Sequence, residues 1–193
     1  MTRSVDDRPT VLVVDDESAV ADVLALKIRD ECETRVAYGG EEALEKIDES
    51  VDAVLLDRRM PDIHGDDVLA EIRDREYDCV VVMTTAVDPE LNILEMDFDD
   101  YLSKPIETET LLSTLDQQLD TKQSGDPKLD AFFAVVSKLD VLESELTPAE
   151  LAESDEYEKH KAEAERLGRE LQSTHEDFED IVDTFRDIER NSG

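Results

Sequence analysis

The stretch VDAVLLDRRMP, residues 51–61, decides the fold. Its apolar run ends in a carboxylate, Asp57, and the pair Met60-Pro61 follows. A second apolar run, Val11–Val14, ends in the same way at Asp15-Asp16. Short apolar runs of this kind are typical of strands buried in a parallel sheet. Such sheets bind ligands outside the carboxyl ends of their strands, so the three carboxylates are expected to share one crevice.

Strand-like and helix-like segments alternate over residues 10–120. Helical spacing of apolar side chains, together with Ser18 as an N-cap and Asp88-Pro89 as a helix start, predicts a helix after each strand. Five such units predict an α/β fold with a doubly wound, five-stranded parallel sheet. The expected strands are 11–14, 34–38, 52–56, 79–83 and 98–102, and the expected helices are 18–30, 41–47, one around 68–72, a short one from 88, and one around 111–119.

Strands disappear after QSGDP, residues 123–127, which is rich in turn residues. One helix face is expected over 129–146, and Thr147-Pro148-Ala149-Glu150 predicts a capping box. From Tyr157 to Ile188, apolar residues recur at steps of three and four, which predicts a heptad seam. The seam must pack either against helix 129–146, folded back as a hairpin, or against a second copy of the chain in a homodimer. The expected domains are 9–121 and 128–190, joined by a linker at 122–127.

Acidic residues dominate the composition, with 53 Asp and Glu against 20 Lys and Arg and a formal charge of −33. They are spread along the whole chain among periodic apolar residues, which favours a folded surface in a salt-rich cytoplasm over a disordered tail. At molar salt the Debye length falls to about 3 Å, so the self-repulsion is screened. Residues 126–193 carry 8 basic and 20 acidic residues and no basic run, which argues against direct nucleic-acid binding.

The two cysteines, Cys32 and Cys79, lie far apart and form no CxxC motif, which indicates a reducing compartment. Apolar stretches stay well short of the 18 residues that a membrane span needs, and the N-terminal residues lack the apolar core of a signal peptide. A cytoplasmic protein without membrane contact is expected.

The predicted crevice suits Mg²⁺ and a phosphoryl group, because Mg²⁺ prefers carboxylate oxygens, phosphate oxygens and water. With the metal held by Asp15, Asp16 and Asp57, the Asp57 carboxylate can attack phosphorus in line. Lys104, which follows the last predicted strand, would contact the transferred group as a point charge. A hydroxyl of Thr84 or Thr85 could donate to the same group. Because side chains alternate along a strand, only one of the two faces the crevice, and we favour Thr85.

These residues resemble the response-regulator receiver family over 9–121, with a flavodoxin-like fold. The resemblance implies Asp57 as the phosphoacceptor, a sensor histidine kinase as the phosphodonor, and the backbone carbonyl of Arg59 as a further metal ligand. The motifs that carry it are the acidic pair Asp15-Asp16, Asp57, Met60-Pro61 with Gly65, the switch pair Thr85-Ala86, the switch aromatic Tyr101, and Lys104-Pro105.

The chain departs from the family pattern in three places. The stretch from Thr85 to Lys104 is short, so the fourth helix is expected to be truncated. Met96-Asp97 replaces the usual Gly-Ala before the fifth strand, and the cations Arg58-Arg59 follow the phosphoacceptor, where they are expected to alter the lifetime of the phosphoryl group.

The C-terminal residues 127–190 resemble the HalX domain of halophilic archaea. The residues that carry this resemblance are Phe132-Phe133, Ser137-Lys138, Leu142-Glu143, Glu150-Leu151 and Glu156-Tyr157.

The sequence therefore predicts a two-component response regulator rather than an enzyme, with the helical module acting through protein contacts on a downstream partner that the sequence does not name. Transcription control by direct DNA contact is the alternative output, although neither a helix-turn-helix nor a basic face is found. A phosphatase that reuses the Asp nucleophile would carry a second Asp at position 59, where Arg59 stands. A receiver that never accepts phosphate is disfavoured by the complete set of site residues.

Overall fold

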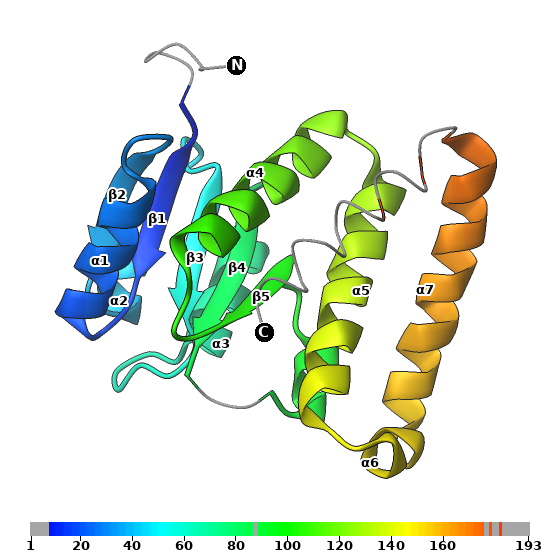
Figure 1. Ribbon diagram of the computed structural model, residues 1–193. Helices are drawn as coiled ribbons and strands as arrows, with labels where there is room; N and C mark the ends of the chain where they lie inside the picture. Colours follow the sequence, from blue (N-terminus) through cyan, green and yellow to red (C-terminus); the bar gives the residue numbers. More distant parts are fainter. Residues whose placement is uncertain (1–7, 87–88, 176–177, 179–181, 183–193) are drawn as a thin grey trace. The chain divides into compact units, whose positions relative to one another are not determined.

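The structure, a computed structural model, describes residues 8–86, 89–175, 178 and 182 (Figure 1). The chain forms two compact units that divide between Thr85 and Ala86. The first unit contains β1 (Thr10–Val14), α1 (Ser18–Ile28), β2 (Glu33–Ala37), α2 (Gly40–Lys46), β3 (Ala53–Asp57), α3 (Gly65–Asp74) and β4 (Val80–Thr85). The second contains the 3-10 helix η2 (Leu91–Glu95), β5 (Asp100–Ser103), α4 (Thr108–Ser124), α5 (Pro127–Glu145), α6 (Pro148–Ala152) and α7 (Asp155–Thr174).

The strands follow the order β2-β1-β3-β4-β5 in one sheet. The pairings of β1 with β2, β1 with β3, and β3 with β4 are all parallel. Val14 lies opposite Leu56, and Asp57 lies opposite Thr84. The predicted doubly wound, five-stranded architecture is confirmed. Because the chain winds outward in both directions from β1 and β3, the carboxyl ends of these two strands flank the point where an open α/β sheet binds its ligand.

The core of the first unit is the sheet itself. Val11–Val14 and Ala53–Leu56 are completely buried, and β4 is buried along its length. Strands this apolar need cover on both faces. In Figure 1, α1 lies in front of the strands of this unit, while α2 and α3, which pack on each other, lie behind them. The helices on both faces keep β1 and β3 in place, and they thereby also fix the positions of the C-terminal residues of these two strands.

Two local predictions about helix starts are wrong. The helix expected from Asp88-Pro89 begins only at Leu91 and is a 3-10 helix; Asp88 lies outside the described residues. Glu90 is still extended, and the Met96 N–H donates to the Ile93 carbonyl, so the short segment closes as a tight three-residue turn. Ser18 is the first helical residue rather than the N-cap. Glu17 takes the cap position, because its carbonyl accepts the Ala21 N–H at 3.1 Å.

The second unit joins α4 to α5 through two residues. Gly125 ends α4 with a left-handed φ of 66°, a conformation that glycine adopts without steric cost. Asp126 then caps α5 by accepting from the Lys128 N–H at 2.9 Å, and Pro127 takes the first helical position. The turn residues at 123–127 thus end one helix and begin the next. The capping box predicted at Thr147 and Glu150 is confirmed at the start of α6.

Within the described residues, α5 packs against α7 of the same chain, which is the hairpin arrangement of the two that the sequence left open. The buried cluster between them consists of Leu129, Phe132, Phe133, Leu167, Leu171 and Phe178. Polar contacts join the two helices on either side of this cluster. Near one end the Lys128 ammonium lies 2.7 Å from Glu170, and toward the other the Tyr157 hydroxyl donates to Glu143 at 2.5 Å. Burial, followed by the bond to Glu143, raises the pKa of Tyr157 to about 12.

The seam predicted to run from Tyr157 to Ile188 is interrupted. Helix α7 ends at Thr174, and His175 is extended. The His175 ring turns to the Asp126 carboxylate, with 2.8 Å between Nε2 and Oδ2, and the His175 backbone N–H donates to the Leu171 carbonyl. Ile181, Phe185 and Ile188, the last expected seam positions, lie outside the described residues.

This contact between Asp126 and His175 makes the hairpin sensitive to acid. The bond to His175, followed by the Lys128 N–H, lowers the pKa of Asp126. A carboxyl with a lowered folded-state pKa stabilises the fold above its unfolded pKa of about 3.9, and the contribution is lost as pH falls through the folded value. We expect amide exchange near residues 126–129 to accelerate as pH falls below about 4. After the intrinsic pH dependence is subtracted, the acceleration should be smaller in His175→Ala; an equal acceleration would contradict the pairing.

Within the part of the chain that the structure describes, no helix is both long and apolar enough to cross a bilayer.

Candidate functional site

Two buried carboxylates lie at the ends of neighbouring strands in the first unit. Asp15 directly follows β1 and Asp57 ends β3, each one residue beyond the paired residues Val14 and Leu56. Adjacent strands lie about 4.8 Å apart, so the two side chains meet at the ligand-binding edge of the sheet. Asp15 is 1% exposed and Asp57 is 5% exposed. The ends of β1 and β3 therefore bring both buried carboxylates to the same edge of the sheet.

Backbone N–H groups orient both carboxylates. The Glu17 N–H donates to Oδ1 of Asp15, and the Arg59 N–H donates to Oδ2 of Asp57, each at 2.9 Å. Each donor lies two residues after its acceptor, so each bond closes a local turn at the strand end. The carboxylates are thus held at the strand ends by their own following turns.

Two buried anions side by side repel, and a divalent cation would relieve that repulsion. Asp16, the neighbour of Asp15, is exposed. Among residues 8–86, 89–175, 178 and 182, no three His, Cys, Asp or Glu side chains form a cluster that could hold a metal by themselves. The pair Asp15 and Asp57 fits Mg²⁺, which uses one or two carboxylates and fills its remaining positions with water and phosphate oxygens.

The loop after Asp57 is pinned at both ends. The Arg58 guanidinium is 7% exposed and pairs through two bonds with Asp66 in the first turn of α3, at 3.0 and 3.2 Å. The Gly65 N–H donates to the Arg58 carbonyl at 2.9 Å. Met60, inside the loop, is buried. The Arg58 cation is therefore engaged by α3, whereas Arg59 is exposed and contributes its backbone to the site.

Both candidate hydroxyls on β4 are buried, Thr84 completely and Thr85 to 1% exposure. Thr84 lies opposite Asp57, and its Oγ1 has no hydrogen-bond partner among the described residues. Side chains of consecutive strand residues point to opposite faces, so the two threonine hydroxyls lie on opposite faces of the sheet. Thr85 is the last residue of β4, the strand paired with β3.

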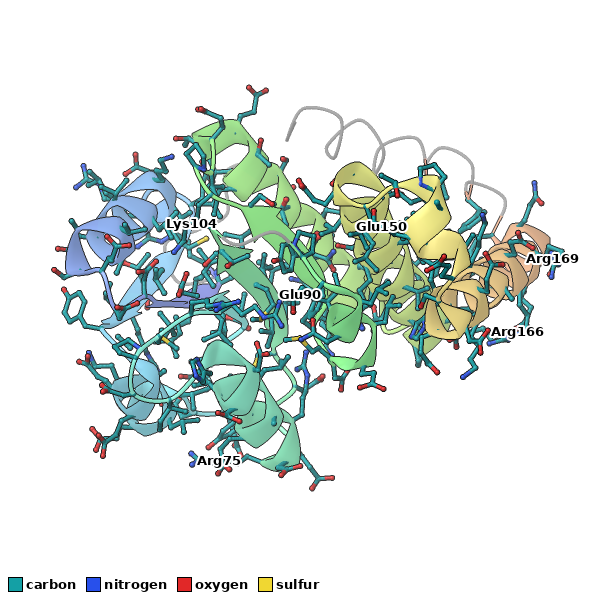
Figure 2. All side chains as sticks on the ribbon, turned by 90° about the horizontal axis from the view of Figure 1, so that it is seen from below. Arg75, Glu90, Lys104, Glu150, Arg166 and Arg169 are labelled. Atoms are coloured by element: carbon teal, nitrogen blue, oxygen red, sulfur yellow. The ribbon has the colours of Figure 1, made fainter. Side chains whose placement is uncertain are left out.

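Lys104 and Tyr101 belong to the second unit. Lys104, labelled in Figure 2, directly follows β5, and its bond to Pro105 is cis. Tyr101 lies in β5, is 4% exposed, and has its ring centroid 5.9 Å from that of Phe98. Tyr101 is therefore a buried residue of β5, and Lys104 lies directly after that strand.

A family model described as the response regulator receiver domain matches residues 11–116. This chain belongs to the response regulator receiver family. A second model, the HalX domain, matches residues 124–189, so the helical hairpin is the HalX domain of this receiver protein. Receiver proteins of this kind are generally signalling proteins.

Relatives and solved structures agree with this assignment. A Haloferax volcanii protein named "Putative transcriptional regulator" is 45% identical over 135 residues, or 69% of this chain and 23% of that protein. The chain thus spans about a quarter of that relative. A Francisella response regulator receiver domain is 28% identical, with a TM-score of 0.53, and covers 62% of this chain and all of its own. A CheY-like receiver from Methanospirillum hungatei, at 24% identity and a TM-score of 0.58, covers the same shares and supports the fold.

Sequence reasoning missed Asp66, which pairs with Arg58, and a buried network in the second unit formed by Asp100, Gln118 and Ser137. One signal for the network was available. Ser137 continues the four-residue spacing of Leu129 and Phe133, so the helical periodicity predicts that it lies on the buried side of its helix. A serine in an apolar row indicates a buried hydrogen-bond partner.

Proposed function

We propose that this receiver accepts a phosphoryl group on Asp57 from the phosphohistidine of a sensor histidine kinase. An Asp57 oxygen bonds to phosphorus as the phosphorus–nitrogen bond of the donor breaks, and the imidazole leaves with a proton. The observation that carries the proposal is the pair of buried carboxylates, Asp15 and Asp57, at the ends of β1 and β3. The Arg59 N–H on Oδ2 supports attack by fixing the orientation of the carboxylate.

Mg²⁺ is the proposed cofactor. Asp15, Asp16 and Asp57 would hold it through their side chains, and Arg59 through its backbone carbonyl. When bound, the ion neutralises the charge that otherwise keeps an anionic donor from a carboxylate. Asp15 is buried and Asp16 is exposed, which supports Asp15 as a ligand on the protein side of the ion and Asp16 as a ligand on its solvent side.

Two further side chains are proposed to bind the transferred group. Thr85 would donate its hydroxyl and Lys104 would supply a positive charge, so both would stabilise the phosphorylated state. Tyr101 is proposed as the switch aromatic that responds to the movement of Thr85. The engaged Arg58 supports a rigid loop next to the acceptor rather than a cation that contacts phosphate.

The proposed output is a protein contact made by the helical module at 128–190, which is linked to the receiver at 9–121 through residues 122–127. In this proposal the chain acts in the cytoplasm, assists only its own phosphorylation and dephosphorylation, and signals through a downstream protein or a second copy of itself.

DNA binding is a second candidate, because the Haloferax relative is named a transcriptional regulator. The surface of α7 gives it little support. Arg166 and Arg169 project outward from α7 (Figure 2), but they lie within 3.8 Å of Glu163, Glu165 or Glu170 on the same helix. Phosphate binding would have to compete with those acidic neighbours.

The test is labelling with a small phosphodonor, acetyl phosphate, in molar potassium chloride with Mg²⁺. We expect a mass increase of one phosphoryl group that disappears in Asp57→Asn and when the divalent ion is chelated. Asp52→Asn is the matched control, because Asp52 precedes the same strand and accepts from the Thr10 N–H at 2.7 Å. Labelling that persists in Asp57→Asn would refute the proposal.

A further inference from the structure

Helix α5 has a second buried side, separate from the one that faces α7. It packs against β5 and against η2, and all three elements belong to the second unit (Figure 1). Ser137 and Lys138 lie on this side, with exposures of 0% and 7%. A completely buried hydroxyl and a nearly buried ammonium need partners, and both partners lie before or within β5.

Asp100 is the partner of Ser137. Its Oδ1 accepts from the Ser137 hydroxyl at 2.5 Å and from the Tyr101 N–H at 2.7 Å, and its Oδ2 accepts from the Gln118 amide at 2.9 Å. The donors come from α5, β5 and α4. Burial raises the pKa of Asp100, and the three hydrogen bonds oppose that rise. A desolvated carboxyl is costly unless it is hydrogen-bonded, so the Ser137 hydroxyl of α5 offsets part of the cost of burying Asp100.

Lys138 makes the other contact. Its Nζ donates to the Met96 carbonyl at 2.5 Å and lies 4.9 Å from the centre of the Phe98 ring. Phe98 is 1% exposed and packs against the ring of Tyr101. A cation held over an aromatic face in a nearly dry site contributes more than one at the surface. Met96 stands where the receiver family usually has glycine, so this departure falls at the docking contact.

Tyr101 touches both contacts. Its N–H donates to Asp100, which holds Ser137, and its ring packs on Phe98, which holds Lys138. A turn of the Tyr101 ring would therefore disturb the Phe98 ring on which Lys138 lies, whereas the backbone N–H bond to Asp100 stays with the strand. The pair Ser137-Lys138 is also part of the motif that identified the HalX domain, which gives that motif a physical role.

We propose that Asp100 and Phe98 form a docking surface whose occupant is α5 of the same chain, and that reorientation of Tyr101 loosens this helix. The docking rests on the contacts alone, whereas its control by phosphorylation rests on the proposed function. The loosened state exposes the Ser137-Lys138 side of α5 together with β5, which are the surfaces then available to a partner.

Docking is tested by amide hydrogen exchange in the full chain at molar potassium chloride. Ser137→Ala removes the α5 donor, and Ser144→Ala is the matched control, because its hydroxyl donates to the Val141 carbonyl of its own helix turn. Loss of a hydrogen bond to a buried carboxyl group should speed exchange in 100–103 and 127–145 by at least about tenfold. Equal exchange in the two variants would overturn the docking role.

Asp100→Asn supplies a second, conservative variant. Its carbonyl can still accept from Ser137 and Tyr101, while its amide can donate to a reversed Gln118 side chain. We expect exchange in α5 closer to wild type than in Ser137→Ala. A faster rate than in Ser137→Ala would show that the contact needs the carboxyl itself and would overturn the proposed pattern of donors and acceptors around Asp100.

Control is tested by adding beryllofluoride and Mg²⁺ and following two regions at once. Slower exchange in residues 58–65 reports binding at Asp57, and faster exchange in 127–145 reports release of α5. We expect both in wild type and neither in Asp57→Asn. Slower exchange at 58–65 without faster exchange in α5 would overturn the coupling and leave the proposed function standing. No change in either region would count against the proposed function itself.

Discussion

Replacing Gly65 with alanine is expected to lower the free energy of unfolding by about 3 kcal/mol, the upper end of the usual cost of overpacking. A Cβ at this position would lie 2.9 Å from the Arg58 Cα and even closer to the Asp57 carbonyl oxygen. Both atoms belong to the backbone, so no rotamer change relieves the clash. The Gly65 N–H also bonds to the Arg58 carbonyl, which holds the two segments together.

The same substitution is expected to slow phosphorylation at Asp57. The loop that must move carries the Arg59 N–H, which fixes the Asp57 carboxylate. A misplaced nucleophile loses rate steeply, so we expect labelling by acetyl phosphate to fall about 100-fold, as a displacement of about 1 Å can cause.

Gly39→Ala is the matched control for this prediction. A Cβ there would meet only Asp62 Oδ2, at 3.9 Å, and the backbone of Gly39 is extended. Denaturant unfolding and labelling should both be measured in molar potassium chloride, because the charge of −33 destabilises the chain in dilute salt. If Gly65→Ala matched Gly39→Ala in both measurements, the close approach of α3 to the end of β3 would be wrong.

The acidic site could be placed from the sequence because each carboxylate ends an apolar run. Strand periodicity and parallel topology then bring Asp15 and Asp57 to one edge of the sheet. The partner of Arg58 could not be predicted in this way. Asp66 lies eight residues ahead, across an irregular loop, and no periodic pattern links the two positions. Contacts of this kind depend on how a loop folds, which local propensity does not determine.

In the second unit, too, the sequence predicts the regular elements but not the contacts between them. Helical periodicity and the turn residues predicted α5 and its start, and the capping box predicted α6. The sequence could not decide whether the hairpin closes within one chain, because an apolar stripe specifies only that it must be covered. Nor could it reveal that Asp100, one of several acids before and within β5, is buried. That depends on Gln118 and Ser137, which arrive from two later helices.

Leu171→Ala is expected to cost about 2–5 kcal/mol and to detach α7 from α5. Leu171 is completely buried in the cluster that contains Phe132 and Phe133. Helix α7 buries only Tyr157, Leu167 and Leu171 along its described length, so each carries a large share of its attachment. Deleting a buried leucine removes its transfer free energy and leaves a cavity. An isolated helix of this length is marginal in water, so detachment should also lower the helical content.

Leu26→Ala makes the same change at a side chain that is 56% exposed on α1, and it should shift stability by less than about 0.5 kcal/mol. Circular dichroism against temperature and amide exchange in 155–174 would compare the two variants. Labelling of Asp57 should survive in Leu171→Ala, because its carboxylate neighbours lie in the other unit. If Leu171→Ala proved as mild as Leu26→Ala, α7 would not be held by α5 of its own chain, and pairing between two copies would become the better account of the seam.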